Sequence, residues 1–200
     1  MLVKVFQPEY YILKKAFEEK LWKEVIIRLF KSQNKVTNLG ISPISIVEEM
    51  AKEIREKSDV ECNFYQSAED VPDPNELSSE KKKLMIFDDL LLEKQNTCEL
   101  YYVRGRHSNV DCYYVDQNYS KLPRQTIREN TNFICMFPQD LKNLNHIFVD
   151  HVGSDMTKEE FRKLCKTAWE KQHGFVIIDL SKKKHDGKYG SGLDEFYIPN

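Results

Sequence analysis

Two adjacent acids follow one of the apolar runs of the sequence and are the first candidates for chemistry. The run at residues 84–87 has the length of a strand, and Asp88 and Asp89 come directly after it. At the end of a buried strand, one carboxylate can hold the hydration shell of a magnesium ion while the next polarises an attacking water. Asp is also a favoured residue at the start of a helix. The pair therefore indicates either phosphate chemistry or a helix cap.

Two arginines and a glutamine are the next candidates. Arg104 and Arg106 precede the strand-like residues 110–115, and Gln117 follows them. Cations at a helix C-terminus interact favourably with the helix dipole, so the arginines could be a solvated cap. A guanidinium can also neutralise charge on a transferring phosphoryl group, often in the site of a neighbouring subunit. The amide of Gln117 could orient a water, or the residue could simply belong to a turn.

The order of these motifs carries a resemblance to a known family. An apolar strand that ends in paired acids is similar to the Walker B motif of P-loop ATPases. Residues 84–138 resemble the genome-packaging ATPases of the FtsK/HerA type, above all those of Polinton (Maverick) elements, virophages and relatives of the poxvirus packaging enzyme. Besides the acids and residues 104–107, the matching motifs are Gln117-Asn118-Tyr119, Leu122-Pro123 and Gln125-Thr126-Ile127-Arg128. The resemblance extends over residues 150–169 and 192–199.

The resemblance implies a role for each matching residue. Asp88 would hold magnesium through water, Asp89 would activate the lytic water, and Gln117 would be the sensor glutamine. Arg106 would be the arginine finger, with Arg104 as the second choice. The implied cofactors are Mg²⁺ and ATP. The implied partners are double-stranded DNA, capsid proteins and further copies of the chain in a ring. The implied activity is ATP-driven packaging or translocation of the DNA of a virus-like element.

The chain departs from the family's pattern at the phosphate-binding loop. No G-x-x-x-x-G-K-[ST] occurs, and none of the 7 glycines is followed by Lys-Ser or Lys-Thr. Asp116 stands where the family usually has a small hydroxyl residue, and its charge would repel a nucleotide. The resemblance therefore implies a RecA/ASCE-like P-loop core that lacks its first strand and its Walker A loop.

Two functional hypotheses stay open. In the first, the chain is the C-terminal portion of a packaging motor ATPase, inactive by itself because nothing positions the phosphates. In the second, it is a non-enzymatic, degenerate remnant that acts as a protein-interaction scaffold. The paired acids, Arg106 and Gln117 favour the first hypothesis, and the missing glycine loop favours the second.

Strand-like and helix-like segments alternate after residue 80. The apolar runs, which are short and largely continuous, lie at residues 84–87, 110–115, 133–137 and 175–180. Such runs are typical of strands buried on both faces. Helical segments are expected at residues 91–103, 123–129 and 139–149, and a capping box from Thr157 to Glu160 opens a further helix. The alternation predicts an α/β fold with a mainly parallel sheet flanked by helices, whose ligands bind at the carboxyl ends of the strands.

The first part of the chain has a different pattern. Residues 2–6 indicate a short strand, and helical periodicity follows over residues 8–30. Ser42 and Pro43 are typical of a helix start, at the N-cap and the first helical position. Residues 58–80 form an acidic loop with two prolines and are the segment expected to be mobile. We expect a single partial domain over residues 1–200, with a C-terminal tail at 181–200.

The implied family register leaves a gap in the sheet. The P-loop strand of the family lies between the strands equivalent to residues 110–115 and 133–137, and residues 2–6 resemble the strand that follows it. Unpaired buried amides cost about 1–3 kcal/mol each. We therefore expect the chain to close the gap by pairing its remaining strands, to dimerise through exposed edges, or to aggregate.

Composition and charge limit the ligands, the metal or disulfide sites and the cellular location that we expect for this chain. Lys and Arg number 30 and Asp and Glu 32, a net charge of −2, so any polyanion site must be local. The run Lys182-Lys183-Lys184 is one candidate for contact with a DNA backbone, or a solvated tail. The 5 cysteines and 5 histidines lack metal-ligand spacing, so neither a zinc site nor a disulfide framework is expected. Without a recognisable signal peptide or spanning segment, we expect an intracellular location, in cytoplasm or nucleus.

Overall fold

A computed structural model describes residues 3–6, 63, 65, 70–88, 95–193 and 195–199. By its internal contacts the chain divides into two compact units, residues 1–8 with 68–200 and residues 9–67. Of the second unit only residues 63 and 65 are described, so the helices expected over 8–30 and from Ser42 lie outside the described residues. The fold below is that of the first unit.

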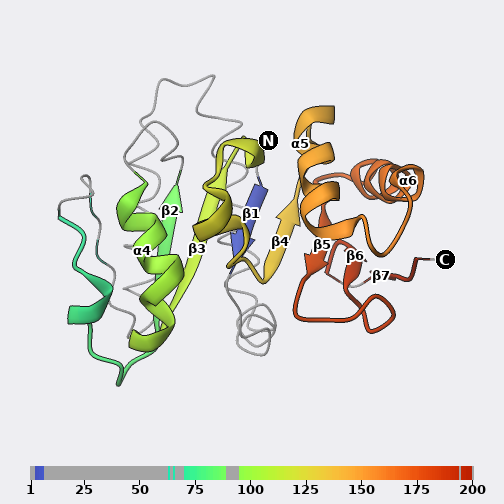
Figure 1. The fold of residues 1–200 in the computed structure, drawn as a ribbon. Helices are drawn as coiled ribbons and strands as arrows, with labels where there is room; N and C mark the ends of the chain where they lie inside the picture. The colour runs from blue at the N-terminus through green and yellow to red at the C-terminus, as the bar shows by residue number, and fades with distance from the viewer. Residues whose placement is uncertain are drawn as a thin grey trace. The chain divides into compact units, whose positions relative to one another are not determined.

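One seven-stranded sheet organises this unit (Figure 1). Across the sheet the strands follow the order β2-β3-β1-β4-β5-β6-β7. Their bounds are β1 Val3–Phe6, β2 Lys83–Asp88, β3 Val110–Asp116, β4 Phe133–Met136, β5 Val176–Asp179, β6 Tyr189–Ser191 and β7 Glu195–Tyr197. The strand predicted near the N-terminus and the four apolar runs of the second half are thus confirmed as strands.

Among the described residues, three α-helices and two π-helical turns lie in the connections between the strands. The helices are α4 (Asn96–Arg104), α5 (Leu141–Ile147) and α6 (Lys158–Trp169), and the π-helical turns span Arg124–Arg128 and Phe148–Val152. The capping box at α6 is confirmed in part, because the Thr157 side chain accepts the N–H of Glu160 at 3.2 Å. Helix α6 buries Phe161 and Leu164 on its apolar side. The helix expected at 123–129 is a π-helical turn instead.

Strand directions differ from the expected mainly parallel sheet. In the described sheet, β2 and β3 are the only neighbours that pair in parallel, and α4 lies in the connection between them, whereas the other neighbouring strands pair antiparallel. Between β4 and β5 the chain forms two helices, α5 and α6, and the second helix brings it back in the opposite direction. Apolar runs and helix periodicity predict elements but not the direction in which a strand re-enters the sheet.

β1 occupies the position between β3 and β4 where the resemblance implies the P-loop strand of the family. This strand runs antiparallel to both neighbours, with Val5 opposite Tyr114 of β3 and opposite Ile134 of β4. The chain therefore neither pairs β3 directly with β4 nor leaves a groove between them. Because β1 reverses the direction expected for a P-loop strand, its first residue, Val3, lies beside Asp116 at the carboxyl end of β3.

Tyrosines dominate the core under α4. Tyr101 of α4 and Tyr114 of β3 are fully buried, and the ring of Phe87 in β2 meets the Tyr101 ring edge-on at 5.7 Å. The other side of β2 is open, with Leu84 37% and Ile86 47% exposed. The interpretation of this run as a strand buried on both faces is therefore wrong, because the side chains on one face of β2, which is an edge strand of the described sheet, reach solvent.

The C-terminal tail expected over residues 181–200 contains two short strands. After β5 the chain continues into β6 and β7, which pair with each other and extend the sheet. The turn between them includes Gly192, whose φ of +74° favours glycine. Strands of three residues are too short for a period-2 signal, so the sequence pattern did not indicate them.

We predict that Val5→Pro lowers the free energy of unfolding by at least about 3 kcal/mol, because proline removes an N–H from a strand that is paired on both sides. Urea denaturation followed by circular dichroism measures the change. Val5→Ala, which keeps the N–H, is the control and should cost clearly less. Equal losses for the two variants would show that β1 is not a central strand.

Candidate functional site

The carboxyl edge of β2 and β3 gathers three of the candidate residues. Asp88 pairs with Val115, so Asp88 and Asp116 end neighbouring parallel strands one residue apart in register. Gln117 follows directly and is exposed to solvent. The backbone of Asp88 is described but its side chain is not, and Asp89 lies outside the described residues. Asp88 and Gln117 thus lie at the same end of the parallel pair β2 and β3.

Asp116 is fully buried at this edge. Its Oδ1 accepts the backbone N–H of Asn118 at 2.7 Å, which fixes the turn that follows Gln117. Next in the chain, Ser120 N–H donates to Oδ1 of Asn143 in α5 at 3.0 Å. The carboxylate that departs from the family pattern therefore has a local structural task, to shape the loop at the end of β3.

The two arginine candidates lie at the opposite end of β2 and β3, where these strands begin. Arg104 ends α4, and Arg106 is in the 3-10 turn Gly105–Ser108 that leads into β3. Both are exposed. Lys83, the first residue of β2, pairs with the first residue of β3, so the six-residue length of β2, roughly 17 Å at 3.3 Å per residue, separates this edge from Asp88. Within the described part of one chain, Arg104 and Arg106 therefore lie far from the backbone of Asp88.

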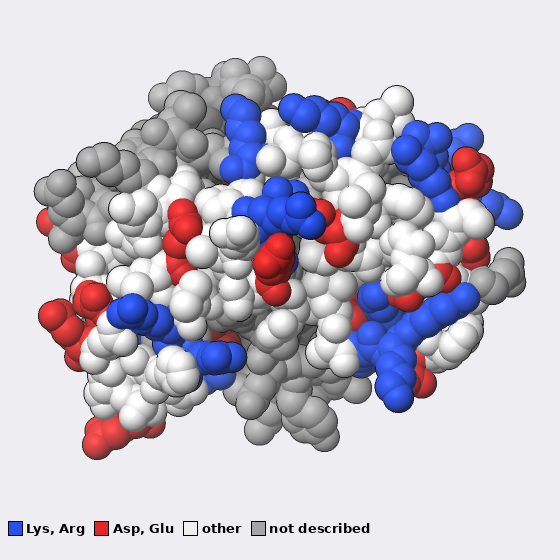
Figure 2. Space-filling view, in the orientation of Figure 1, with Lys and Arg blue, Asp and Glu red and all other residues white. Residues whose placement is uncertain are grey.

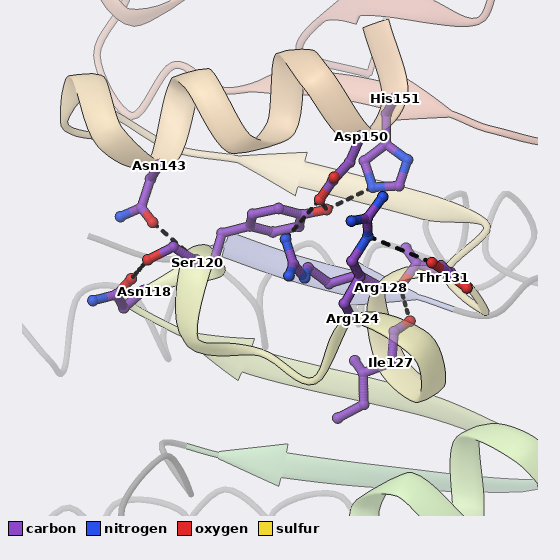
Figure 3. Close-up of polar contacts among 11 residues, drawn as sticks. Asn118, Ser120, Arg124, Ile127, Arg128, Thr131, Asn143, Asp150 and His151 are labelled. Carbon is purple, nitrogen blue, oxygen red and sulfur yellow. Dashed lines mark hydrogen bonds and ion pairs between the residues drawn. The ribbon is translucent and has the colours of Figure 1, made fainter.

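A buried polar network that the sequence did not indicate lies over the face of the sheet (Figure 3). The Tyr119 hydroxyl donates to Oδ2 of Asp150 at 3.1 Å and lies 2.6 Å from Nε2 of His151. Arg128 Nη1 donates to the same Asp150 oxygen at 2.7 Å, and the Arg128 guanidinium stacks over the Tyr119 ring at 5.3 Å. The side chains of Arg128 and Asp150 are both only 11% exposed. We call these four residues the Tyr119 network.

The π-helical turns position this network. Pro123 precedes the first turn and starts it with an extended ψ of 122°, and at its end the Thr131 hydroxyl donates to the Ile127 carbonyl at 2.7 Å. The second turn continues α5 and carries Asp150 and His151. A π-helical turn adds a residue to the helical repeat and redirects the side chains that follow, and such turns are frequent at functional sites.

Burial and hydrogen bonding set the protonation of the network. Desolvation lowers the pKa of His151 from 6.5 to about 4, although Asp150 acts to raise it, so the imidazole is neutral at pH 7. Desolvation, followed by the charge of Asp150, raises the pKa of Tyr119 well above its usual value. With Nε2–H of His151 donating to the Tyr119 oxygen and Tyr119 donating to Asp150, every contact has one donor and one acceptor.

A second cluster ties the same loop to β6. Lys188 forms an ion pair with Asp155 and donates to the backbone oxygen of His151 at 3.1 Å, and the Tyr189 hydroxyl donates to Asp155 at 2.6 Å. Burial acts to raise the pKa of Asp155, but the bonds from Lys188 and Tyr189 outweigh it and lower that pKa. The loop from Asp150 to Asp155 is therefore held at both ends by charged, partly buried contacts.

The remaining candidates are dispersed. Lys182 lies 3.8 Å from the Asp179 carboxylate and over the Phe196 ring, while Lys183 is exposed. Within the described ranges, no three His, Cys, Asp or Glu side chains form a group that could hold a metal ion. Burial raises the pKa of the Cys98, Cys112 and Cys165 thiols to about 12, so these thiols do not act as nucleophiles at neutral pH.

Comparisons with protein-family models, with curated proteins and with solved structures find no match to this chain. In the part of the chain that the structure describes, no helix has the length and apolar character needed to cross a membrane.

Sequence reasoning noted Tyr119 and Arg128 within motifs but missed their partners. Asp150 and His151 lie more than twenty residues further along the chain, and neither has the spacing of a known motif. The one signal that could have found them is the adjacent Asp-His pair after an amphipathic helix, which is too short to be specific.

We predict that Asp150→Asn lowers the free energy of unfolding by about 3 kcal/mol, because it leaves the charge of Arg128 buried without a carboxylate. Urea denaturation at pH 7 measures it. The matched control is Glu129→Gln, which breaks the ion pair of Glu129 with Arg124, whose side chains are 57% and 66% exposed, and should change stability by less than about 0.5 kcal/mol. Equal effects of the two variants would contradict a buried pair.

We also predict an acid-sensitive stability that depends on His151. Because its folded pKa of about 4 is below the unfolded 6.5, its contribution is complete above pH 6.5 and is lost as pH falls towards 4, by up to about 1.4 kcal/mol per pH unit. Urea unfolding from pH 7 to 4.5 measures the slope. His151→Gln should flatten it, and His146→Gln, at an exposed histidine, should not. An unchanged slope in His151→Gln would refute the assignment.

Proposed function

We propose that this chain is the C-terminal portion of an ATP-driven motor ATPase that packages or translocates the DNA of a virus-like element, and that it does not hydrolyse ATP alone. The observation that carries the proposal is the parallel pairing of β2 with β3, which aligns Asp88 with the end of β3 at one sheet edge. Of the motifs that resemble packaging ATPases, Asp88 ends β2 and Gln117 directly follows β3, so these two stand at the carboxyl ends of the parallel strands, where a nucleotide site would lie.

The types of residue that the sequence places after β2 and β3 suit a magnesium nucleotide. Asp88 would hold the ion through water, Asp89 would activate the attacking water, and Gln117 would orient it. When bound, Mg²⁺ supplies charge neutralisation for the phosphates. The buried amide of Gln139, in the loop that follows β4 at the same edge, has no hydrogen-bond partner for its nitrogen or its oxygen among the described residues. A buried amide without hydrogen-bond partners suits a site in which a ligand supplies the missing polar group.

The sequence and the described fold do not offer a loop of the kind that holds nucleotide phosphates. The sequence contains no P-loop motif, and β1, which occupies the central position, runs the wrong way for one. Phe6, its last residue, pairs with Phe133 at the start of β4, so the residues after β1 leave from the edge opposite Asp88. Without a cradle, the triphosphate is not positioned for attack, and this supports an inactive isolated chain.

The position of the arginines favours action between subunits. Arg106 is exposed and lies at the edge opposite the acids, so it cannot serve the site of its own chain. In a ring, the same exposed turn can reach the carboxyl edge of a neighbouring copy. Arg106 is therefore the proposed finger, with Arg104 at the end of α4 as the alternative.

The DNA contact is the least localised part of the proposal. Figure 2 shows basic and acidic side chains interspersed over one face, in keeping with a net charge of −2. Lys182, Lys183 and Lys184 would touch the phosphate backbone from the loop between β5 and β6. Capsid proteins would be further partners of the assembled motor.

The second candidate function is that of a non-enzymatic scaffold. The observation that favours it is β1 itself, because a strand that closes the sheet in the antiparallel direction completes the fold without a nucleotide loop. The open side of β2, with Leu84 and Ile86 exposed, gives such a scaffold an apolar surface.

We predict that the isolated chain has no measurable ATPase rate, and that a chimera with an N-terminal P-loop strand gains one that depends on assembly. In the chimera, Asp89→Ala and Arg106→Ala should each be inactive alone and recover hydrolysis when mixed, because finger and acids act across a boundary. Phosphate release measures the rate. Arg162→Ala, at an exposed arginine of α6, is the control and should stay active.

Two results would decide against the motor. A folded chimera that binds ATP but never hydrolyses it would favour the scaffold, and a rate that does not require Asp89 would exclude the proposed site. Recovery with Arg104→Ala in place of Arg106→Ala would transfer the finger to Arg104.

A further inference from the structure

A pocket opens between the two π-helical turns, over the face of the sheet and apart from its carboxyl edge (Figure 3). Its volume is about 130 Å³, and it is lined by Arg124, Arg128, Glu129, Val149, Asp150 and His151. Arg124 and Arg128 rise from the first turn towards Asp150 and His151 in the second. The size suits a small polar group rather than a whole nucleotide.

Hydrogen-bond donors exceed acceptors in this pocket. Arg128 uses Nη1 for Asp150, while its buried Nε makes no hydrogen bond to the described residues. Arg124 has only the long contact of its Nε with Glu129 at 3.5 Å, between two exposed side chains. Each guanidinium has five N–H groups, so most of those in the two arginines remain available. A complementary ligand must bring acceptors.

Each of the two carboxylates in the pocket already has an arginine partner for one of its oxygens. Asp150 Oδ2 already accepts from Arg128 and from Tyr119, and Glu129 is paired with Arg124. A cationic ligand would lie against two guanidinium groups. An anion meets the opposite situation, because Arg124 can leave its weak surface pair and turn towards the ligand at little cost.

We propose that this pocket binds an oxyanion of the phosphate class, held by Arg124 and Arg128 with His151 beside it. Guanidinium groups match the oxygens of a phosphate in pairs, which favours phosphate over a spherical anion. Val149, which is 75% exposed at the rim, offers an apolar contact to a group attached to the phosphate. The site is independent of the carboxyl edge and of the motor function proposed above.

The test is thermal unfolding and calorimetry of the full chain with inorganic phosphate. At 10 mM phosphate we expect the Tm to rise by about 3 °C above that in sodium chloride of equal ionic strength. Arg124→Ala should weaken phosphate binding at least about tenfold, and Arg124→Lys by less, because it keeps the charge. Arg162→Ala, at an exposed arginine of α6, is the matched control and should bind as the unchanged chain does.

A second readout follows the His151 ring by NMR. The groups that face this imidazole are Tyr119, Asp150, Arg128 and Lys188, and a phosphate would add negative charge beside it. The pKa of His151, about 4 in the free protein, should therefore rise when phosphate binds. No response of the ring, together with equal phosphate binding by Arg124→Ala, would overturn the proposal.

Two probes distinguish the source of the phosphate. Phenyl phosphate represents a phosphomonoester, and a short DNA duplex represents backbone phosphodiesters. If phenyl phosphate competes with inorganic phosphate and the duplex does not, the ligand is a monoester. If the duplex competes and Arg124→Ala abolishes its effect, the phosphate belongs to a nucleic-acid backbone. Failure of both probes and of inorganic phosphate to bind would leave the pocket without an oxyanion and refute the proposal.

Discussion

The middle of the sheet depends on the two-sided pairing of one four-residue strand. β3 and β4 run in the same direction but do not pair with each other, and β1 satisfies the backbone groups that both turn towards it. Unpaired backbone N–H and C=O groups in a buried sheet carry a large desolvation penalty. The carboxyl edge, the loop after β3 and the return into β4 all take their positions from strands that β1 joins.

The connection between β3 and β4 passes over the middle of the sheet and needs contacts of its own to hold it in place. The Tyr119 network supplies it, since Arg128 and Tyr119 belong to that connection and Asp150 and His151 to the loop after α5. A buried ion pair is stable only where its remaining hydrogen-bonding groups have partners. Here the Tyr119 hydroxyl is the further partner of Asp150, and the imidazole of His151 is the partner of that hydroxyl. The ring of Tyr119 covers the guanidinium.

The separation of Asp88 from Arg106 bears on the proposed motor. The parallel pair β2 and β3 keeps these residues apart by the length of a strand, so the proposed motor would need neighbouring copies of the chain to combine them. The direction of β1 works against a nucleotide loop at the same edge. The direction of β1 is therefore the feature that separates the motor hypothesis from the scaffold hypothesis. Both hypotheses are compatible with the elements around this strand.

The amino-acid sequence by itself determined strands β1 to β5, but not β6 and β7, and it determined where α6 begins, because apolar runs and capping residues act over a few neighbours. It also ordered Asp88, Arg106 and Gln117 along the chain. Only the tertiary structure decided that β1 runs antiparallel in the centre, that two helices reverse the chain before β5, and that β2 is an edge. It alone brought Asp150 and His151 to Tyr119. Strand direction and long-range polar contacts depend on the packing of residues far apart in the chain, which no local pattern encodes.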